Sequence, residues 1–152
     1  MAIIKLLNET TTVPAEISAA EITKELVRAG AVEISTQYRE GRVHGLSWVM
    51  PIKGSEVYFT MPARVEGVLR ILVSRHKGYL GPERKQELVE KAQRVAWRHL
   101  YRWVQSQIAM IATHMLEPGE AFLSFATIPG GTQTLFERFS EFARLPAPGA
   151  RQ

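Results

Sequence analysis

The sequence contains no cysteine among its 152 residues. Disulfides, thiolate zinc sites, iron–sulfur ligation and cysteine nucleophiles are therefore excluded, and the absence fits a reducing compartment. Long hydrophobic runs are missing too. The N-terminal run is broken by Lys5, and no later stretch approaches the roughly 20 apolar residues that cross a bilayer. We therefore expect a cytoplasmic protein with no membrane partner.

Signatures of catalysis are equally scarce. Ser47 and Ser124 lack the setting of a nucleophile, the acidic residues are scattered singly, and the Gly turn at 129–132 is followed by no lysine that could bind phosphate. None of the histidines stands at metal-ligand spacing from another: His44, His76, His99 and His114. The sequence therefore predicts a protein that is not an enzyme and that binds no metal or cofactor.

Hydrophobic periodicity predicts an α+β fold. Ser18 and Glu21 have the spacing of a capping box, which predicts the start of an N-terminal helix that ends at Gly30. Alternating apolar and polar residues then predict three strands, with turns at Glu40-Gly41 and after Pro51, forming an antiparallel meander with one apolar face. Such a sheet needs helices to cover that face.

Helical patterns dominate the rest of the chain. One helix is expected to end near Ser74, and Gly81-Pro82 begins a long central helix over about 82–116 that covers one face of the sheet. Thr134 with Glu137 predicts the cap of a final helix. We expect a single α+β domain over 1–145 and a flexible tail over 146–152.

Positive charge is concentrated in the middle of the chain. The net charge is +4, yet the segment from Arg64 to Arg102 holds ten Lys or Arg against four Glu, a local excess of +6. Such asymmetry can steer an anionic partner toward one face of a protein.

The segment KAQRVAWRHLYRWV, residues 91–104, lies in that basic region. Spaced at about 100° per residue, Leu88, Val95 and Trp103 fall on a broad apolar side, which predicts core positions. His99 lies there too and is expected to be a hydrogen-bonded core histidine. Five cations fall on one line of the helix: Arg84, Lys91, Arg94, Arg98 and Arg102.

This basic line has two interpretations. It is either a solvated face on which the aliphatic stems of the Lys and Arg side chains cover apolar surface, or a phosphate-binding surface extended by Arg75 and Lys77 in the preceding loop. Trp97 and Tyr101, toward the edge of the line, could stack on nucleic-acid bases or form a subunit interface.

Several motifs resemble a known group of proteins. The strings GRVHGLSW (41–48) and RVAWR (94–98), with EAFL (120–123), are similar to small uncharacterised proteins of tailed phages and related mobile elements. The resemblance covers roughly residues 12–125. It implies an infected or lysogenic prokaryotic cytoplasm and no assigned activity. The helix–three-strand–helix order also resembles double-stranded-RNA-binding domains, but the basic helix start of those domains is replaced by PARVEG, which indicates shared topology without a shared site.

These features favour a non-enzymatic protein that binds nucleic acid through the basic face of its long helix, mainly by backbone contacts. The alternative is a homo-oligomeric interaction module or an inhibitor of a host protein, suggested by the apolar excess on that helix. A third hypothesis, an enzyme or a protein that sequesters a small nucleotide, rests on the basic residues alone.

Overall fold

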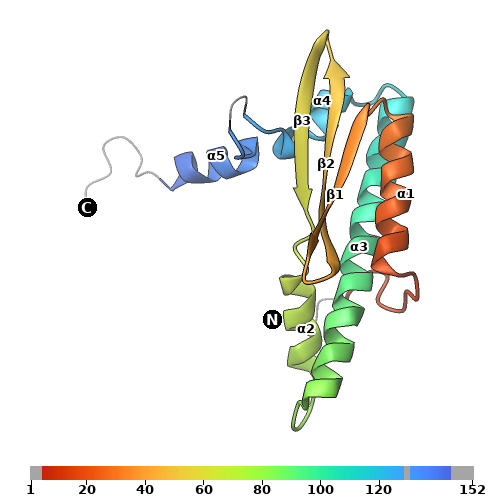
Figure 1. The fold of residues 1–152 in the computed structure, drawn as a ribbon, viewed down its shortest axis with the longest axis vertical. Helices are drawn as coiled ribbons and strands as arrows, with labels where there is room; N and C mark the ends of the chain where they lie inside the picture. The colour runs from red at the N-terminus through yellow and green to blue at the C-terminus, as the bar shows by residue number, and fades with distance from the viewer. Residues whose placement is uncertain (1–4, 129–130, 145–152) are drawn as a thin grey trace.

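A computed structural model describes residues 5–128 and 131–144 of the chain. The expected α+β fold is confirmed: an N-terminal helix precedes a three-stranded antiparallel sheet, and a long helix follows it (Figure 1). The helices are α1 (Ala15–Arg28), α2 (Glu66–Arg75), α3 (Pro82–Ala112), α4 (Pro118–Ala121), the 3-10 turn η1 (Leu123–Phe125) and α5 (Leu135–Ala143). The strands are β1 (Glu33–Arg39), β2 (Arg42–Ile52) and β3 (Ser55–Pro62).

Helix α1 begins earlier than its sequence predicts. Its N-cap is Pro14, so Ser18 lies one turn inside the helix, fully buried and without a hydrogen-bond partner for its hydroxyl among the described residues. The predicted Ser18–Glu21 capping box is therefore wrong. The predicted end is confirmed: Gly30 has a φ of 108°, and the Gly30 and Ala31 amides bond back to Val27 and Leu26 in a Schellman motif.

Helix α3 ends at Ala112, four residues before the predicted end near 116. His114 adopts a left-handed φ of 58°, and the amides of His114 and Met115 donate to Ile111 and Met110. This is again a Schellman end, formed without glycine. The sequence offers no glycine or proline before Pro118, and the earlier end was therefore missed.

The sheet has the order β1-β2-β3, with both pairs antiparallel. Pro51, predicted to lie in a turn, lies inside β2 opposite Glu56 of β3. The β1 pairing ends at Glu33–Val49, so no strand needs a hydrogen bond from the proline nitrogen on that side. The tight turns at Glu40-Gly41 and Lys53-Gly54 have positive φ at both residues, as hairpin turns of this length require.

One face of the sheet carries the aromatic part of the core. Trp48 and Phe59 face each other in the register and stack at 5.2 Å, while Phe122 packs edge-on against both. Trp103 of α3 contacts Phe122 at 5.9 Å between ring centroids. Figure 1 shows α1 and α3 side by side over this face, with α2 beside the N-terminal part of α3.

The opposite face of the sheet is polar and open. A row of hydroxyl groups crosses it, in which Gln37 donates to Ser47 at 2.9 Å and Ser47 lies 3.1 Å from Thr60. Figure 1 shows α5 extending from this side of the molecule, away from α1 and α3. Within 5–128 and 131–144, no helix has the length and apolarity needed to cross a membrane. The tail predicted over 146–152 lies outside the described residues.

Candidate nucleic-acid interface

Trp97 belongs to the core of the protein. Its side chain is fully buried, and its indole nitrogen donates to the Val43 carbonyl of β2 at 3.3 Å. The expectation that Trp97 stacks on bases is therefore wrong, because no ligand can reach the ring. Helix α3 is covered by α1 on one side and by the sheet on another, which places this position inside.

Arg98 is also buried and does not lie on the predicted binding surface. It is 9% exposed, and both terminal nitrogens donate to one oxygen of Glu21 on α1, at 2.5 and 3.0 Å. Its guanidinium lies 4.4 Å from the centroid of the Tyr101 ring. The prediction that Arg98 binds phosphate is therefore wrong, and the Tyr101 face expected to stack on bases is occupied by a cation of the same helix.

Other cations of the predicted surface, on the basic line and in the preceding loop, have partners in the folded chain. Glu9, on the N-terminal arm, lies 2.6 Å from Arg75 and 3.7 Å from Lys91. Arg84 pairs with Glu87 at 2.7 Å, and Arg102 donates to Gln105 at 3.1 Å. These contacts are on the surface and individually weak, so they reduce the positive potential without blocking access to the side chains.

His99 is hydrogen-bonded, as expected, but it is only partly buried. A ring nitrogen meets the Leu7 carbonyl. This contact fixes the N-terminal arm against α3, and the adjacent Leu6 is buried in the core. The folded arm brings Glu9 close to the basic line.

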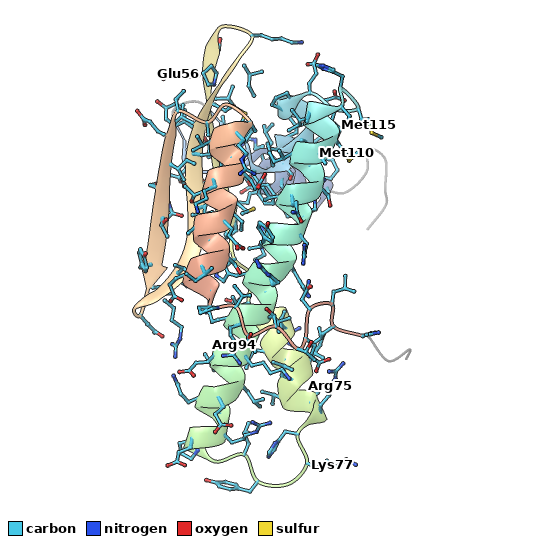
Figure 2. All side chains as sticks on the ribbon, turned by 90° about the vertical axis from the view of Figure 1, so that its right-hand side faces the viewer. Glu56, Arg75, Lys77, Arg94, Met110 and Met115 are labelled. Atoms are coloured by element: carbon cyan, nitrogen blue, oxygen red, sulfur yellow. The ribbon has the colours of Figure 1, made fainter. Side chains whose placement is uncertain are left out.

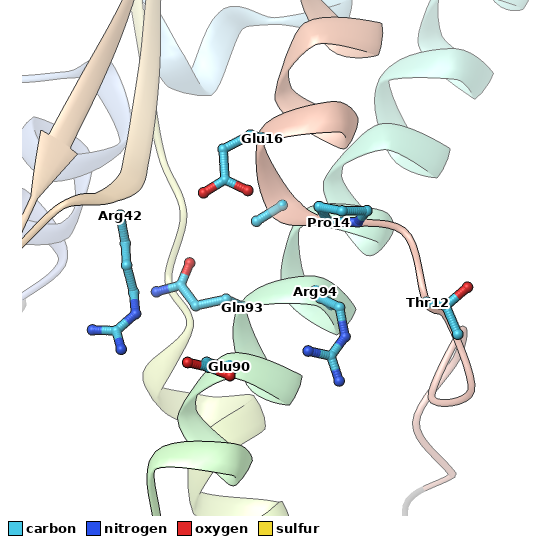
Figure 3. Close-up of a pocket in the computed structure, with 8 residues that line it drawn as sticks. Thr12, Pro14, Glu16, Arg42, Glu90, Gln93 and Arg94 are labelled. Carbon is cyan, nitrogen blue, oxygen red and sulfur yellow. The ribbon is translucent and has the colours of Figure 1, made fainter.

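Arg94 and Arg42 are partly exposed cations of this surface. They line one pocket of about 450 Å3, Arg94 from the middle of α3 and Arg42 from the start of β2 (Figure 3). Neither has an ion pair or a hydrogen bond from its side chain within the part of the chain that the structure describes. Both guanidinium groups point the same way in Figure 3. The remaining lining residues are Thr12, Pro14, Ala15, Glu16, Glu90 and Gln93.

The N-terminus of α1 contributes to the same pocket. Pro14 provides no side-chain cap, and the first helical residues, Ala15 and Glu16, line the pocket. Unpaired amides at such a position carry a partial positive charge. The Oε1 atom of Gln93 is buried and has no hydrogen-bond partner among the described residues. Glu16 and Glu90 balance the two arginines, so the pocket suits a ligand of low charge.

The loop between α2 and α3 presents Lys77 and Tyr79. Tyr79 is 89% exposed, the highest exposure of any large hydrophobic side chain among the described residues, and its carbonyl lies 3.1 Å from His76 Nε2. Figure 2 shows Lys77 at one end of the molecule and Arg94 nearer its middle, with Arg75 between them. The accessible cations therefore extend along this half of the molecule.

The sequence alone missed Arg42, Tyr79, Glu9 and Glu21. Tyr79 could have been found, because it stands in a loop already identified as basic. Arg42 and the two acids could not, because they reach α3 from distant elements. No group of three metal-ligating side chains occurs within residues 5–128 and 131–144.

No family model matches the chain, and no curated protein or solved structure resembles it significantly.

Proposed function

We propose that the protein binds the phosphate backbone of nucleic acid through a cationic surface made of Arg42, Arg94, Lys91, Lys77 and Tyr79. The observation that carries the proposal is the pair Arg42 and Arg94, which face one pocket without ion-pair partners among the described residues. Each guanidinium offers a planar fork of donors that matches phosphate oxygens.

The charge of the pocket favours a phosphodiester over a polyphosphate. Glu16 and Glu90 lie on the same pocket as the two arginines and would repel a ligand with several negative charges. A phosphodiester has one charge, so one arginine neutralises it, whereas a nucleoside triphosphate leaves most of its charge against the carboxylates. Backbone binding is therefore favoured over sequestration of a small nucleotide.

Binding is expected to depend little on base sequence. Arginine and lysine contacts to phosphate position a protein on nucleic acid but read no bases. Tyr79 adds an exposed ring next to Lys77, and a base stacked on such a ring contributes about 1–3 kcal/mol. The contribution requires an unpaired base, which favours single strands over duplex. The resemblance to phage proteins supports a setting in an infected or lysogenic cell.

Fluorescence anisotropy with labelled single- and double-stranded oligonucleotides tests the proposal. The variant Arg42→Ala/Arg94→Ala should lose about tenfold or more in affinity, and the slope of log affinity against log salt should fall by about two, since each lost phosphate contact removes about one. The matched control Lys24→Ala/Arg28→Ala removes the same charge from exposed positions on α1. Affinity that does not change with salt, or equal losses in the two variants, would contradict backbone binding.

A further inference from the structure

Helix α5 presents an apolar face that the described chain covers only at its start, where the Arg64 guanidinium lies 5.5 Å from the centroid of the Phe136 ring. Leu135, Phe136, Phe139 and Phe142 are 38%, 46%, 64% and 71% exposed. The spacing of these residues places them on one side of the helix. Helix α5 has nine residues, too few for an isolated helix to be stable in water. Its apolar face therefore needs a partner.

The start of α5 is fixed firmly to the body of the protein. Thr134 and Glu137 form the predicted capping box, with the Glu137 amide donating to Thr134 Oγ1 at 3.2 Å. The Leu135 amide donates to the Ala126 carbonyl at 2.8 Å, and Thr127 bridges to Thr134. Segment 126–127 in turn pairs with the edge of β3. The direction in which α5 leaves the sheet is thus set by backbone hydrogen bonds.

A groove of about 1110 Å3 lies beside this attachment point, over the open face of the sheet. Its apolar lining includes Val49, Val57, Tyr58, Leu123 and Ile128. Leu135 lies at its rim, but Phe139 and Phe142 point into solvent. Because the first turn of α5 is pinned, the helix cannot fold its aromatic face back into the groove from which it emerges.

The groove is acidic, whereas α5 and its C-cap Arg144 carry equal numbers of acidic and basic residues. Among the described residues that line the groove, Glu33 and Glu56 are the charged ones, and both are acidic. The acids of α5 are engaged within the chain: Glu137 in the capping box, and Glu141 with Gln133 at 2.5 Å. Arg138 also lies 3.9 Å from Glu141, and Arg144 at the end of the helix is exposed.

We propose that two copies of the chain associate by inserting α5 of each into the groove of the other. At their exposed fractions, three phenylalanines offer about 270–450 Å2 per helix. Two helices in two grooves would then bury about 1,100–1,800 Å2 in total, which matches a stable interface. An interface formed only between the two α5 helices would bury about half that area. The exchange is two-fold symmetric and closes on itself, so it ends at a dimer.

Sedimentation equilibrium of the full chain provides the first test. The wild-type protein should be a dimer, and Phe139→Ser/Phe142→Ser should be a monomer with an unchanged far-ultraviolet spectrum. Tyr38→Ser is the control, because Tyr38 is an exposed aromatic residue, at 63%, outside the groove and α5. A wild-type monomer over roughly a hundredfold range of concentration overturns the proposal, as does a dimer that persists in the double variant.

A charge exchange distinguishes the groove from other surfaces. Arg138→Glu/Arg144→Glu makes groove and helix both acidic, and Glu33→Arg/Glu56→Arg makes the groove basic. The helix variant alone should be a monomer, and an equimolar mixture with the groove variant should restore a dimer that contains one copy of each. If the helix variant alone stays dimeric, the helix does not sit in the groove and the proposal fails.

Discussion

Glu21 holds Arg98 inside the layer formed by α1 and α3. The Arg98 side chain is 10% exposed, whereas that of Glu21 is 37% exposed. Removing Arg98 would leave a carboxylate that water can still reach. Removing Glu21 would leave a guanidinium with little access to water, and an uncompensated buried charge is strongly destabilising. The acid is therefore the more sensitive member of the pair.

We predict that Glu21→Ala lowers the free energy of unfolding by about 2–3 kcal/mol, in the range for hydrogen bonds to charged groups. The control is Glu87→Ala on α3. Glu87 pairs at 2.7 Å with Arg84, both side chains are more than half exposed, and a helical surface pair of this kind contributes about 0.3–0.5 kcal/mol. Urea denaturation compares the two variants. Equal losses would show that the Arg98–Glu21 pair is not a structural contact.

Part of this residue-scale picture was available from the sequence. Helical periodicity correctly put Val95 and Leu88 in the core and Arg94 on an accessible side. It could not show that the side of α3 carrying Arg98 is covered by α1, because periodicity defines faces relative to one helix axis and does not identify the neighbour of each face. The burial of Trp97 was missed for the same reason.

At the scale of elements, β2 is the strand on which the sheet depends. It pairs with both neighbours, and its register with β1 shifts between Gln37 and Tyr38. Gly45 lies at this irregularity. A Cβ atom there would stand 2.9 Å from the Met61 carbonyl oxygen and 3.3 Å from Pro62 Cα, both backbone atoms of β3. Backbone atoms of a paired strand cannot move aside as the end of a side chain can.

Gly45→Ala is therefore expected to destabilise the protein by about 1–3 kcal/mol, the usual cost of overpacking. Gly67→Ala is the matched control, because Gly67 lies in α2 with no atom within 4 Å of its added Cβ. Alanine in a helix should stabilise by about 0.5–1 kcal/mol there. The midpoints of thermal and urea denaturation should fall for Gly45→Ala and rise for Gly67→Ala. A tolerated Gly45→Ala would refute the close approach of the strands.

The elements themselves were the most predictable part of the fold. Strict alternation of apolar and polar residues identified all three strands. The pattern is strict because a shift of one residue in the strand register would turn every apolar side chain to the wrong face of the sheet. Ends were predictable where glycine or proline marks them, as at Gly30 and Pro82. They were missed where the helix ends without glycine, as at His114, and where the spacing of a capping box occurs inside the helix, as at Ser18.

At the scale of the whole molecule, the two proposed surfaces are separate. The cationic surface lies along α3, its preceding loop and the start of α1, whereas α5 and its groove lie on the other side of the sheet (Figure 1). Formation of the proposed dimer would leave both cationic surfaces free, so that one dimer would contact two stretches of nucleic acid if both proposals hold.

The dimer should increase affinity for long nucleic acids through avidity. For an oligonucleotide long enough to reach both surfaces, the second contact becomes intramolecular, and linked sites gain about 10²–10⁴ in apparent affinity when the geometry allows both to engage. Phe139→Ser/Phe142→Ser should bind short oligonucleotides like the wild type and long ones at least about tenfold more weakly. Anisotropy over a series of lengths measures this. Equal losses at every length would mean that α5 itself contacts nucleic acid.

The packing of α1 against α3 has a consequence for synthesis of the chain. The ribosome has synthesised α1 and the whole sheet once it reaches residue 62, but α3, the helix that completes the cover of the apolar sheet face, ends at Ala112. At about 5–20 residues per second, translation of the intervening stretch takes roughly 2.5–10 s. During that interval the nascent chain carries an apolar sheet face, with Trp48 and Phe59 at its centre, that has only α1 to protect it. This interval is when the chain most needs a chaperone.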